Sequence, residues 1–105
     1  MINKIYSILG ICMKAGKLVC GSDVCIENIK KRKAKLVIVS EDASQNTKDK
    51  IANITKQNNI TLIYFGEKEF LSKSVGKVDK AIYAILDDGF SKKILELLKE
   101  SKGAI

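Results

Sequence analysis

Apolar residues follow two alternating patterns along this chain, a helical period and short continuous runs. The helical period covers residues 2–15 and 22–32, a stretch from about 44 to 59, a short stretch between Gly66 and Gly76, and a last stretch from residue 88. The continuous runs are residues 17–20, 36–40, 60–65 and 80–86, the last with alternate residues on two faces. This order predicts an α/β fold, a three-layer α-β-α sandwich around a four-stranded, mostly parallel or mixed sheet.

Local signals refine these elements. The runs LVIVS and ITLIYF predict strands that are buried on both faces. Candidate N-caps precede three helices: Ser22, then Ser44 or Asn46, then Asp88. We expect the last five residues, 101–105, to form a loose tail.

Length and composition indicate one domain that folds without covalent help. The 105 residues are 46% hydrophobic, which is enough for a core without disulfides or metal. Cys12, Cys20 and Cys25 have neither a CxxC spacing nor a histidine partner, so we interpret them as reduced, mostly buried thiols. Reduced thiols and the lack of a long apolar segment predict a cytoplasmic protein that is neither exported nor membrane-spanning.

Positive charge is concentrated in the first third of the chain. The net charge is +7, and residues 1–35 hold eight basic and two acidic side chains, against eleven and ten in residues 36–105. A localised basic patch is typical of proteins that bind a phosphate backbone. A solvated lysine-rich face is the structural alternative.

Residues suited to catalysis are few. The chain has no histidine, the commonest general base, and no Walker or GxGxxG motif. The adjacent acids Glu41–Asp42 and Asp87–Asp88 follow apolar runs, so they are either turn residues and helix caps or ligands of a divalent ion in a small hydrolase. We interpret them as turn residues, and expect a non-enzymatic protein without metal or cofactor.

Loop residues offer a better binding surface. Residues 21–23 begin a helix, residues 41–44 follow a strand, and residues 75–79 precede one. We expect these three segments to lie at one end of the sheet, where Gly21 lets a partner approach the backbone. The aromatic residues fall mostly on core positions, which favours recognition by phosphate and loop contacts over base stacking.

Several motifs resemble a known family. The segments KAKLVIVSEDAS, NNITLIYFG and VGK, with the opening helix and the ending DDGFSKKILELL, are similar to kink-turn RNA-binding ribosomal proteins of the L-seven-Ae type, in particular their small bacterial YlxQ-like branch. The resemblance covers essentially the whole chain. It implies an α-β-α sandwich that binds RNA at a sharp kink containing sheared G·A pairs.

The same resemblance places three unusual residues in the second helix. Kink-turn binders share a G-x-N-E-x-x-K pattern, and the family spacing is kept here because Gly21 lies fourteen residues before Lys35. Asp23, Val24 and Glu27 then stand where the family has Asn, Glu and Lys, and Arg32 replaces a usual Gly. We expect these changes to weaken kink-turn selectivity.

These observations lead to two main hypotheses. The first is an RNA-binding protein, associated with the ribosome or another structured RNA and monomeric. Its phosphate contacts would be Lys14, Lys17, Lys30, Lys33, Lys35 and Lys77, and its docking surface Gly21, Ser22, Asp23, Glu41, Asp42, Ala43, Ser44, Val75, Gly76 and Val78, the two valines packing on an extruded nucleotide. The second is a protein-interaction module on the same fold, in which Asp23 and Glu27 suit a basic partner and no RNA is bound.

Overall fold

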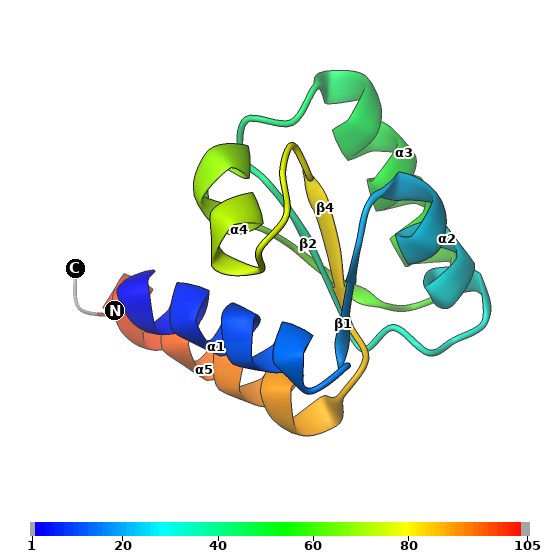
Figure 1. Ribbon diagram of the computed structural model, residues 1–105. Helices are drawn as coiled ribbons and strands as arrows, with labels where there is room; N and C mark the ends of the chain where they lie inside the picture. The colour runs from blue at the N-terminus through cyan, green and yellow to red at the C-terminus, as the bar shows by residue number, and fades with distance from the viewer. Residues whose placement is uncertain (1, 104–105) are drawn as a thin grey trace.

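The computed structural model describes residues 2–103, with the side chains of residues 4–100. Five helices and four strands alternate along this part of the chain (Figure 1). They are α1 (Ile2–Lys14), β1 (Leu18–Cys20), α2 (Ser22–Lys30), β2 (Leu36–Val39), α3 (Gln45–Gln57), β3 (Thr61–Tyr64), α4 (Lys68–Ser74), β4 (Ile82–Ile85) and α5 (Asp88–Gly103). The predicted order of elements is confirmed, with ends that coincide or differ by up to three residues.

The four strands form one mixed sheet in the order β1-β4-β2-β3. Strand β4 runs antiparallel to both β1 and β2, whereas β2 and β3 are parallel. Strands β1, β2 and β3 therefore end at the same end of the sheet, where β4 begins. The turns that precede β1 and β2 and follow β4 lie at the opposite end.

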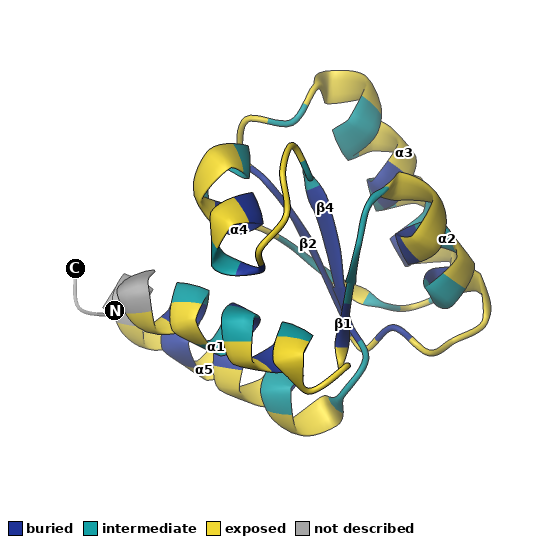
Figure 2. Cartoon of the chain, in the orientation of Figure 1, coloured by how far each residue is buried: buried dark blue, intermediate teal, exposed yellow. Residues whose placement is uncertain are grey.

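Two helical layers cover the sheet and confirm the predicted sandwich. Helices α1, α4 and α5 pack on one face, and α2 and α3 on the other. Side chains of β2 alternate between the two cores, with Leu36 and Ile38 in the first and Val37 and Val39 in the second. All four are fully buried, as predicted for a strand covered on both faces, and Figure 2 shows this dark central band.

The prediction of a buried strand at residues 60–65 is wrong for most of its length. Strand β3 is at the edge of the sheet and pairs only with β2, so Thr61 and Tyr64 are exposed. The Lys48 ammonium lies 5.8 Å from the centroid of the Tyr64 ring. Only Phe65, just past the strand, is buried in the core.

Helix caps agree with the sequence at one of the three predicted positions. The N–H of Thr47 donates to Ser44 Oγ at 3.2 Å, so Ser44 caps α3. Ser22 is instead the first residue of α2, behind Gly21. Before α5, the N–H of Phe90 donates to the carboxylate of Asp87 at 2.9 Å, so this residue and not the next makes the cap hydrogen bond.

The predicted loose tail lies partly beyond what the structure describes. Helix α5 continues through Gly103, so residues 101–103 are helical and that part of the prediction is wrong. Residues 104 and 105 lie outside the described residues.

Candidate functional site

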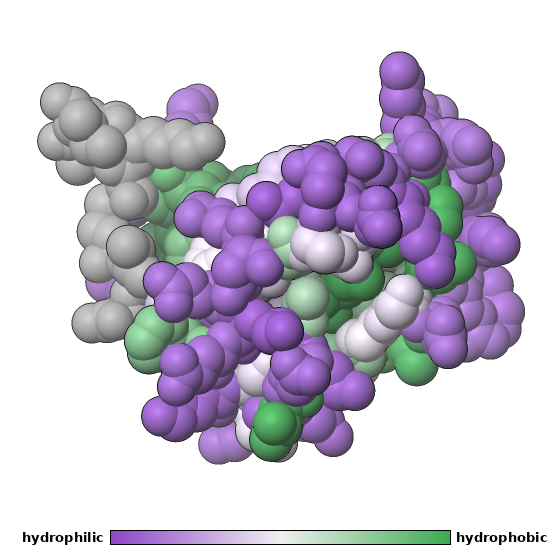
Figure 3. All heavy atoms as spheres, turned by 90° about the horizontal axis from the view of Figure 1, so that it is seen from above, coloured by the Kyte–Doolittle hydropathy of each residue, from purple (hydrophilic) through white to green (hydrophobic). Residues whose placement is uncertain are grey.

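The three segments expected to meet do lie at one end of the sheet. The N–H of Gly21 donates to Ile82 O at 2.9 Å, and that of Ser40 to Ala81 O at 2.9 Å. The N–H of Glu41 donates to Gly66 O at 2.8 Å, which adds the turn after β3. We call this surface the loop end and define it as residues 21–23, 41–44, 66–69 and 75–80. Figure 3 looks down on it and shows a hydrophilic rim around a less polar centre.

Gly21 joins the sheet to α2 in a conformation that favours glycine. Its φ is 101°, in the region that side chains with a Cβ rarely adopt. No side chain caps the first turn of α2, so the positive end of the helix dipole faces the loop end. Ser22 and Asp23 follow and are exposed.

Lys80 lies directly beside Gly21. A Cβ built on that glycine would be 3.8 Å from Lys80 Nζ. A buried network holds the Lys80 backbone: its N–H donates to Ser72 Oγ at 2.9 Å, and the Tyr83 hydroxyl donates to its carbonyl at 2.7 Å. Burial raises the pKa of Tyr83 to about 12, so the hydroxyl remains a donor at neutral pH. These hydrogen bonds hold the backbone of Lys80 and therefore set the point from which its side chain extends toward Gly21.

A pocket of about 610 Å³ opens beside α4. Its walls are Asp42, Lys68, Glu69, Ser72, Lys73, Lys77, Val78 and Asp79. The N–H of Lys68 donates to Asp42 Oδ1 at 3.0 Å and lowers the pKa of that carboxyl. The Lys68 ammonium lies 2.9 Å from Asp79 Oδ1, and this hydrogen bond raises the pKa of Lys68. Asp42, a predicted contact residue, thus holds the start of α4 in place.

The loop before β4 presents one valine and buries the other. Val78 is 84% exposed at the rim of the pocket, and Lys77 and Gly76 beside it are exposed. Val75 is only 7% exposed and packs in the core below α1 and α4. Its burial takes Val75 out of the expected contact surface and leaves Val78 as the apolar side chain of this loop that a ligand can reach.

The segment after β2, residues 41–44, also contains both exposed and half-buried side chains. Glu41 is exposed, whereas Ala43 is half-buried against the second core. Ser44 is committed to the cap of α3. The hydroxyl of Ser44 also donates to Thr47 Oγ1 at 3.0 Å.

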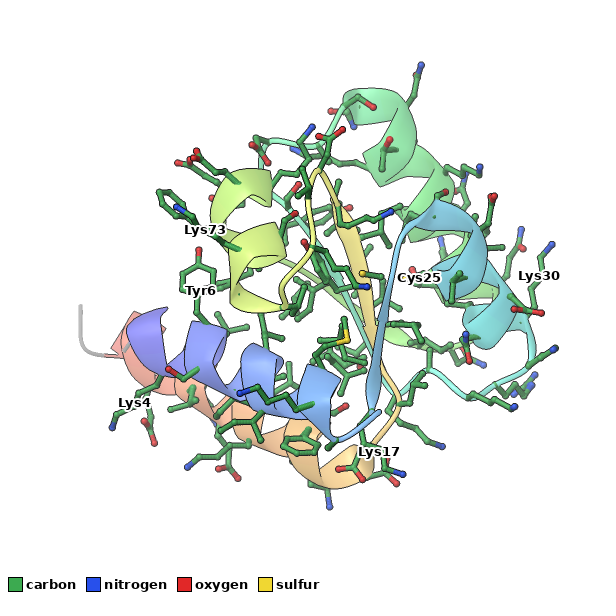
Figure 4. The ribbon with its side chains drawn as sticks, viewed as in Figure 1. Lys4, Tyr6, Lys17, Cys25, Lys30 and Lys73 are labelled. Atoms are coloured by element: carbon green, nitrogen blue, oxygen red, sulfur yellow. The ribbon has the colours of Figure 1, made fainter. Side chains whose placement is uncertain are left out.

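The predicted phosphate contacts do not all share this surface. The N–H of Lys35 donates to Ile85 O at 2.7 Å, and that of Leu86 donates to Lys17 O at 2.8 Å. Both lysines therefore lie at the end of the sheet where β4 finishes, opposite the loop end. Lys14, Lys30 and Lys33 lie at or near the same end, and Figure 4 shows Lys17 and Lys30 away from Lys73. We call residues 14–17, 31–35 and 86–88 the basic end.

The two ends of the sheet differ in charge, a difference that a count of charged residues along the sequence does not show. The basic end carries six cationic side chains and two carboxylates, whereas the loop end carries six carboxylates and three lysines. The docking loops and most of the predicted phosphate contacts therefore lie at opposite ends of the sheet. Helix α2 leads the chain from one end to the other, so the lysines that follow it end up far from Gly21.

Helix α2 presents the three unusual residues to solvent. Asp23, Val24 and Glu27 are all exposed, and Val24 is 44% exposed although it is apolar. Glu27 forms an ion pair with Lys31 at 3.1 Å, one turn later. Between residues 23 and 27, this outward face therefore carries two acids and an apolar side chain.

Sequence reasoning missed Lys68, Lys73 and Lys80. Lys68 and Lys73 belong to α4, a short helix with no distinctive motif. The sequence signal that could have identified them is that this helix directly precedes the VGK segment, residues 75–77. Lys80 has no such signal, because its position beside Gly21 depends on the pairing of β1 with β4.

The three cysteines are free thiols in different surroundings. Cys12 and Cys25 are fully buried, and burial raises their pKa values to about 11 and about 12. Cys25 lies between α2 and the sheet (Figure 4). Cys20, at the end of β1, is half-buried; burial raises its pKa, while the ammonium groups of Lys80 and Lys77 oppose this rise.

We therefore expect alkylation to report on the loop end. Iodoacetamide near pH 8 should modify Cys20 first, since the thiolate is the reactive form and the other two thiols are buried. Cys12 and Cys25 should react only after denaturation, as read by mass spectrometry of peptides over time. A Cys20→Ser variant should lose the early modification. Equal rates at Cys20 and Cys25 in the native protein would contradict this assignment.

The two acidic pairs cannot form one metal site. Glu41 and Asp42 belong to the loop end, whereas Asp87 and Asp88 belong to the basic end. Across the described residues, no group of three or more His, Cys, Asp or Glu side chains is placed to hold a metal ion. None of the helices in that part of the chain is long and apolar enough to cross a bilayer.

Comparison with known proteins agrees with the resemblance noted in the motifs. The model of the ribosomal protein L7Ae/L30e/S12e/Gadd45 family matches residues 3–95. The chain is 34% identical over 97 residues to the RNA-binding protein YlxQ of Enterococcus faecium, covering 92% of this chain and 93% of that protein. It is 33% identical over 93 residues to the RNA-binding protein YlxQ of Bacillus subtilis (strain 168), covering 89% and 93%.

A solved structure shares the fold. A protein of unknown function from Bacillus halodurans C superposes with a TM-score of 0.87 at 28% identity, covering 91% of this chain and 97% of that one. The sandwich with its mixed sheet is thus found in a related sequence. Together with the family match over residues 3–95, these similarities show that the chain belongs to the ribosomal protein L7Ae/L30e/S12e/Gadd45 family.

Proposed function

We propose that this protein binds structured RNA, in a cytoplasmic and non-enzymatic role, with weakened selectivity for kink-turns. Support for RNA as the ligand comes from two relatives whose names describe them as RNA-binding, each more than 30% identical over most of the chain. Support for a ribosomal or similar RNA comes from the family itself.

The outward face of α2 carries the proposal about selectivity. The resemblance implies that kink-turn recognition uses an amide, a carboxylate and an ammonium group on this face. Asp23, Val24 and Glu27 stand at those three positions here. An Asp lacks the amide donor, a Val cannot accept from guanine N–H groups, and a Glu repels phosphate. A base contact is worth about 1–3 kcal/mol of discrimination in DNA complexes, so three lost contacts would remove most of the preference.

Three cations remain at the loop end to contact an RNA. Lys80 lies beside Gly21 at the start of α2, and Lys77 is exposed on the adjacent loop. Lys68 is held by Asp79 and must exchange that partner for a phosphate. Val78 offers an apolar side chain at the rim of the 610 Å³ pocket.

A titration tests both parts of the proposal. A kink-turn RNA and a plain duplex of equal length should bind with affinities that differ by less than about tenfold, roughly the value of one base contact. Both affinities should fall steeply between about 50 and 200 mM salt, because phosphate contacts release counterions. A preference for the kink-turn of a hundredfold or more would overturn the proposed loss of selectivity. Affinities that do not change with salt would overturn the phosphate contacts.

The acidic loop end favours one alternative, a protein-interaction module for a basic partner. Six carboxylates against three lysines form a surface that attracts cations. A protein partner that copurifies equally with and without nuclease treatment would support this alternative. RNA that crosslinks to residues 21–35 would support the main proposal.

A further inference from the structure

Backbone hydrogen bonds hold the segments that form the basic end. Lys17 and Lys35 flank the end of β4 on its two neighbouring strands, about 10 Å apart across two strand spacings. The turn between α2 and β2 is tied to the helix, because the N–H groups of Lys33 and Ala34 both donate to Asn28 O, at 2.9 and 3.2 Å. Ala34 is buried, so the turn is anchored and its basic side chains point away from the core.

Arg32 occupies a backbone conformation that costs free energy. Its φ is 60°, in the left-handed region where glycine is preferred. Asn59, with a φ of 55°, adopts the same conformation in the neighbouring turn. Both residues line a groove of about 340 Å³ together with Lys35, Asn58 and Thr61. This groove combines a guanidinium, an ammonium, amides and a hydroxyl, which are donors for phosphate and ribose oxygens.

The cations at this end are largely free of acidic partners. Within the described residues, the ion pairs are Lys31 with Glu27 and Lys68 with Asp79, so neither involves Lys17, Lys33 or Lys35. Of the two carboxylates at the basic end, Asp87 accepts the N–H of Phe90. The charge of this surface is therefore available to a polyanion.

Distance separates this surface from the loop end. Strand β2 and its flanking residues lead from Lys35 to Glu41, six residues that span about 20 Å when extended. The whole molecule measures 32 × 28 × 26 Å, so the two ends lie on opposite sides of it. A ligand docked on the loops does not reach Lys17 and Lys35 without wrapping around the protein.

We propose that the basic end is a second RNA-binding surface, which takes the phosphate backbone of a duplex segment separate from the RNA at the loop end. One molecule then joins two RNA segments. This inference rests on the proposed RNA binding and adds the division of that binding between two surfaces. Backbone recognition fits because the basic end offers several exposed cations and, among its residues 14–17, 31–35 and 86–88, no aromatic side chain on which a base can stack.

Two charge-matched variants separate the surfaces. The basic-end variant carries Lys17→Gln, Lys33→Gln and Lys35→Gln, and the loop-end variant carries Lys68→Gln, Lys77→Gln and Lys80→Gln. A control variant carries Lys4→Gln, Lys50→Gln and Lys99→Gln, exposed positions on α1, α3 and α5 outside both ends. Each variant loses three positive charges, and thermal unfolding verifies that each is folded.

The readouts are binding stoichiometry and bridging, with an RNA duplex of about 16 base pairs, the span of a double-stranded RNA-binding domain. Native mass spectrometry should find two duplexes per molecule for the unmodified protein and the control, and one for each single-end variant. A surface-bound duplex should capture a second, labelled duplex only through proteins with both ends intact. The basic-end variant should also reduce the slope of log affinity against log salt by about 3, or about 0.9 per lost contact.

The outcomes distinguish this inference from the function on which it rests. If the unmodified protein binds no RNA, the proposed function fails. If it binds one duplex and both variants weaken that single event, RNA binding stands and the second surface is overturned. Bridging that survives in either variant would come from association of protein molecules and would also overturn it. Poly-glutamate that binds the basic end as tightly as the duplex would assign it to an acidic protein.

Discussion

Replacing Asp23, Val24 and Glu27 together by Asn, Glu and Lys should raise the preference for a kink-turn over a plain duplex by about 10- to 1,000-fold. Each restored contact is worth about 1–3 kcal/mol, and neighbouring contacts do not add fully. All three side chains are exposed on one face of α2, so the substitutions need no change in the core. Competitive titration of the two RNAs at one salt concentration measures the effect.

The control for this experiment must match its change of charge. Glu96→Lys on α5 adds the same two positive charges on the opposite face of the sheet, at an exposed position. It should raise the affinity for both RNAs slightly and leave their ratio unchanged. If the triple variant strengthens kink-turn and duplex binding equally, its effect is one of charge alone, and the assignment of α2 as the recognition helix is wrong.

Replacing Ile38 by Ala should cost about 2–5 kcal/mol of unfolding free energy, the largest stability loss that we predict. Ile38 is fully buried on the central strand β2, where its removal leaves a cavity in the core below α1 and α4. Urea unfolding followed by circular dichroism should show a lower midpoint with an unchanged slope, because the area exposed on unfolding is nearly the same.

Ile63 provides the matched comparison for that loss. It is the register partner of Ile38 on β3 and also packs against the first core, but it is only partly buried at the sheet edge. Ile63→Ala should therefore cost less, about 1–2 kcal/mol. Equal losses at the two positions would mean that the edge of the sheet is as well packed as its centre.

These two isoleucines also illustrate what periodicity can and cannot predict. Both lie in short apolar runs, and the sequence alone predicts two buried strands. Of these two strands, only β2 is buried on both faces, because it pairs with β3 and β4, whereas β3 pairs on one side. Position within a sheet depends on pairing between distant segments, and a local pattern of apolar residues carries no information about it.

The caps show the same limit at a finer scale. The sequence offers Ser44 and Asn46 as caps of α3, and the structure selects Ser44, whose Oγ accepts the N–H of Thr47. Asp87 and Asp88 are indistinguishable by composition, and the path of the chain out of β4 decides that the first of them reaches Phe90. Such one-residue differences depend on backbone direction.

The sequence predicts which segments form the candidate site, but it does not predict how the loop segments and the basic residues are placed relative to one another. The sequence identified Gly21, the segment 41–44 and the loop 75–78, and their meeting at one end followed from the order of strands and helices. It also located the basic residues in the first third of the chain, but a count along the chain does not show how far they lie from Gly21 in space. Helix α2 rises about 13 Å over its nine residues and carries Lys33 and Lys35 to the opposite end.

Sequence by itself determined the order of elements, the layered fold and the family, because each depends on local patterns or on matching residues. Tertiary structure alone decided that β3 is an edge strand, that Val75 is buried, and that Lys80 lies beside Gly21. It also decided that positive and negative charge occupy opposite ends of the sheet. The physical reason is that strand pairing brings together residues that are far apart in the chain, and it separates others that are close.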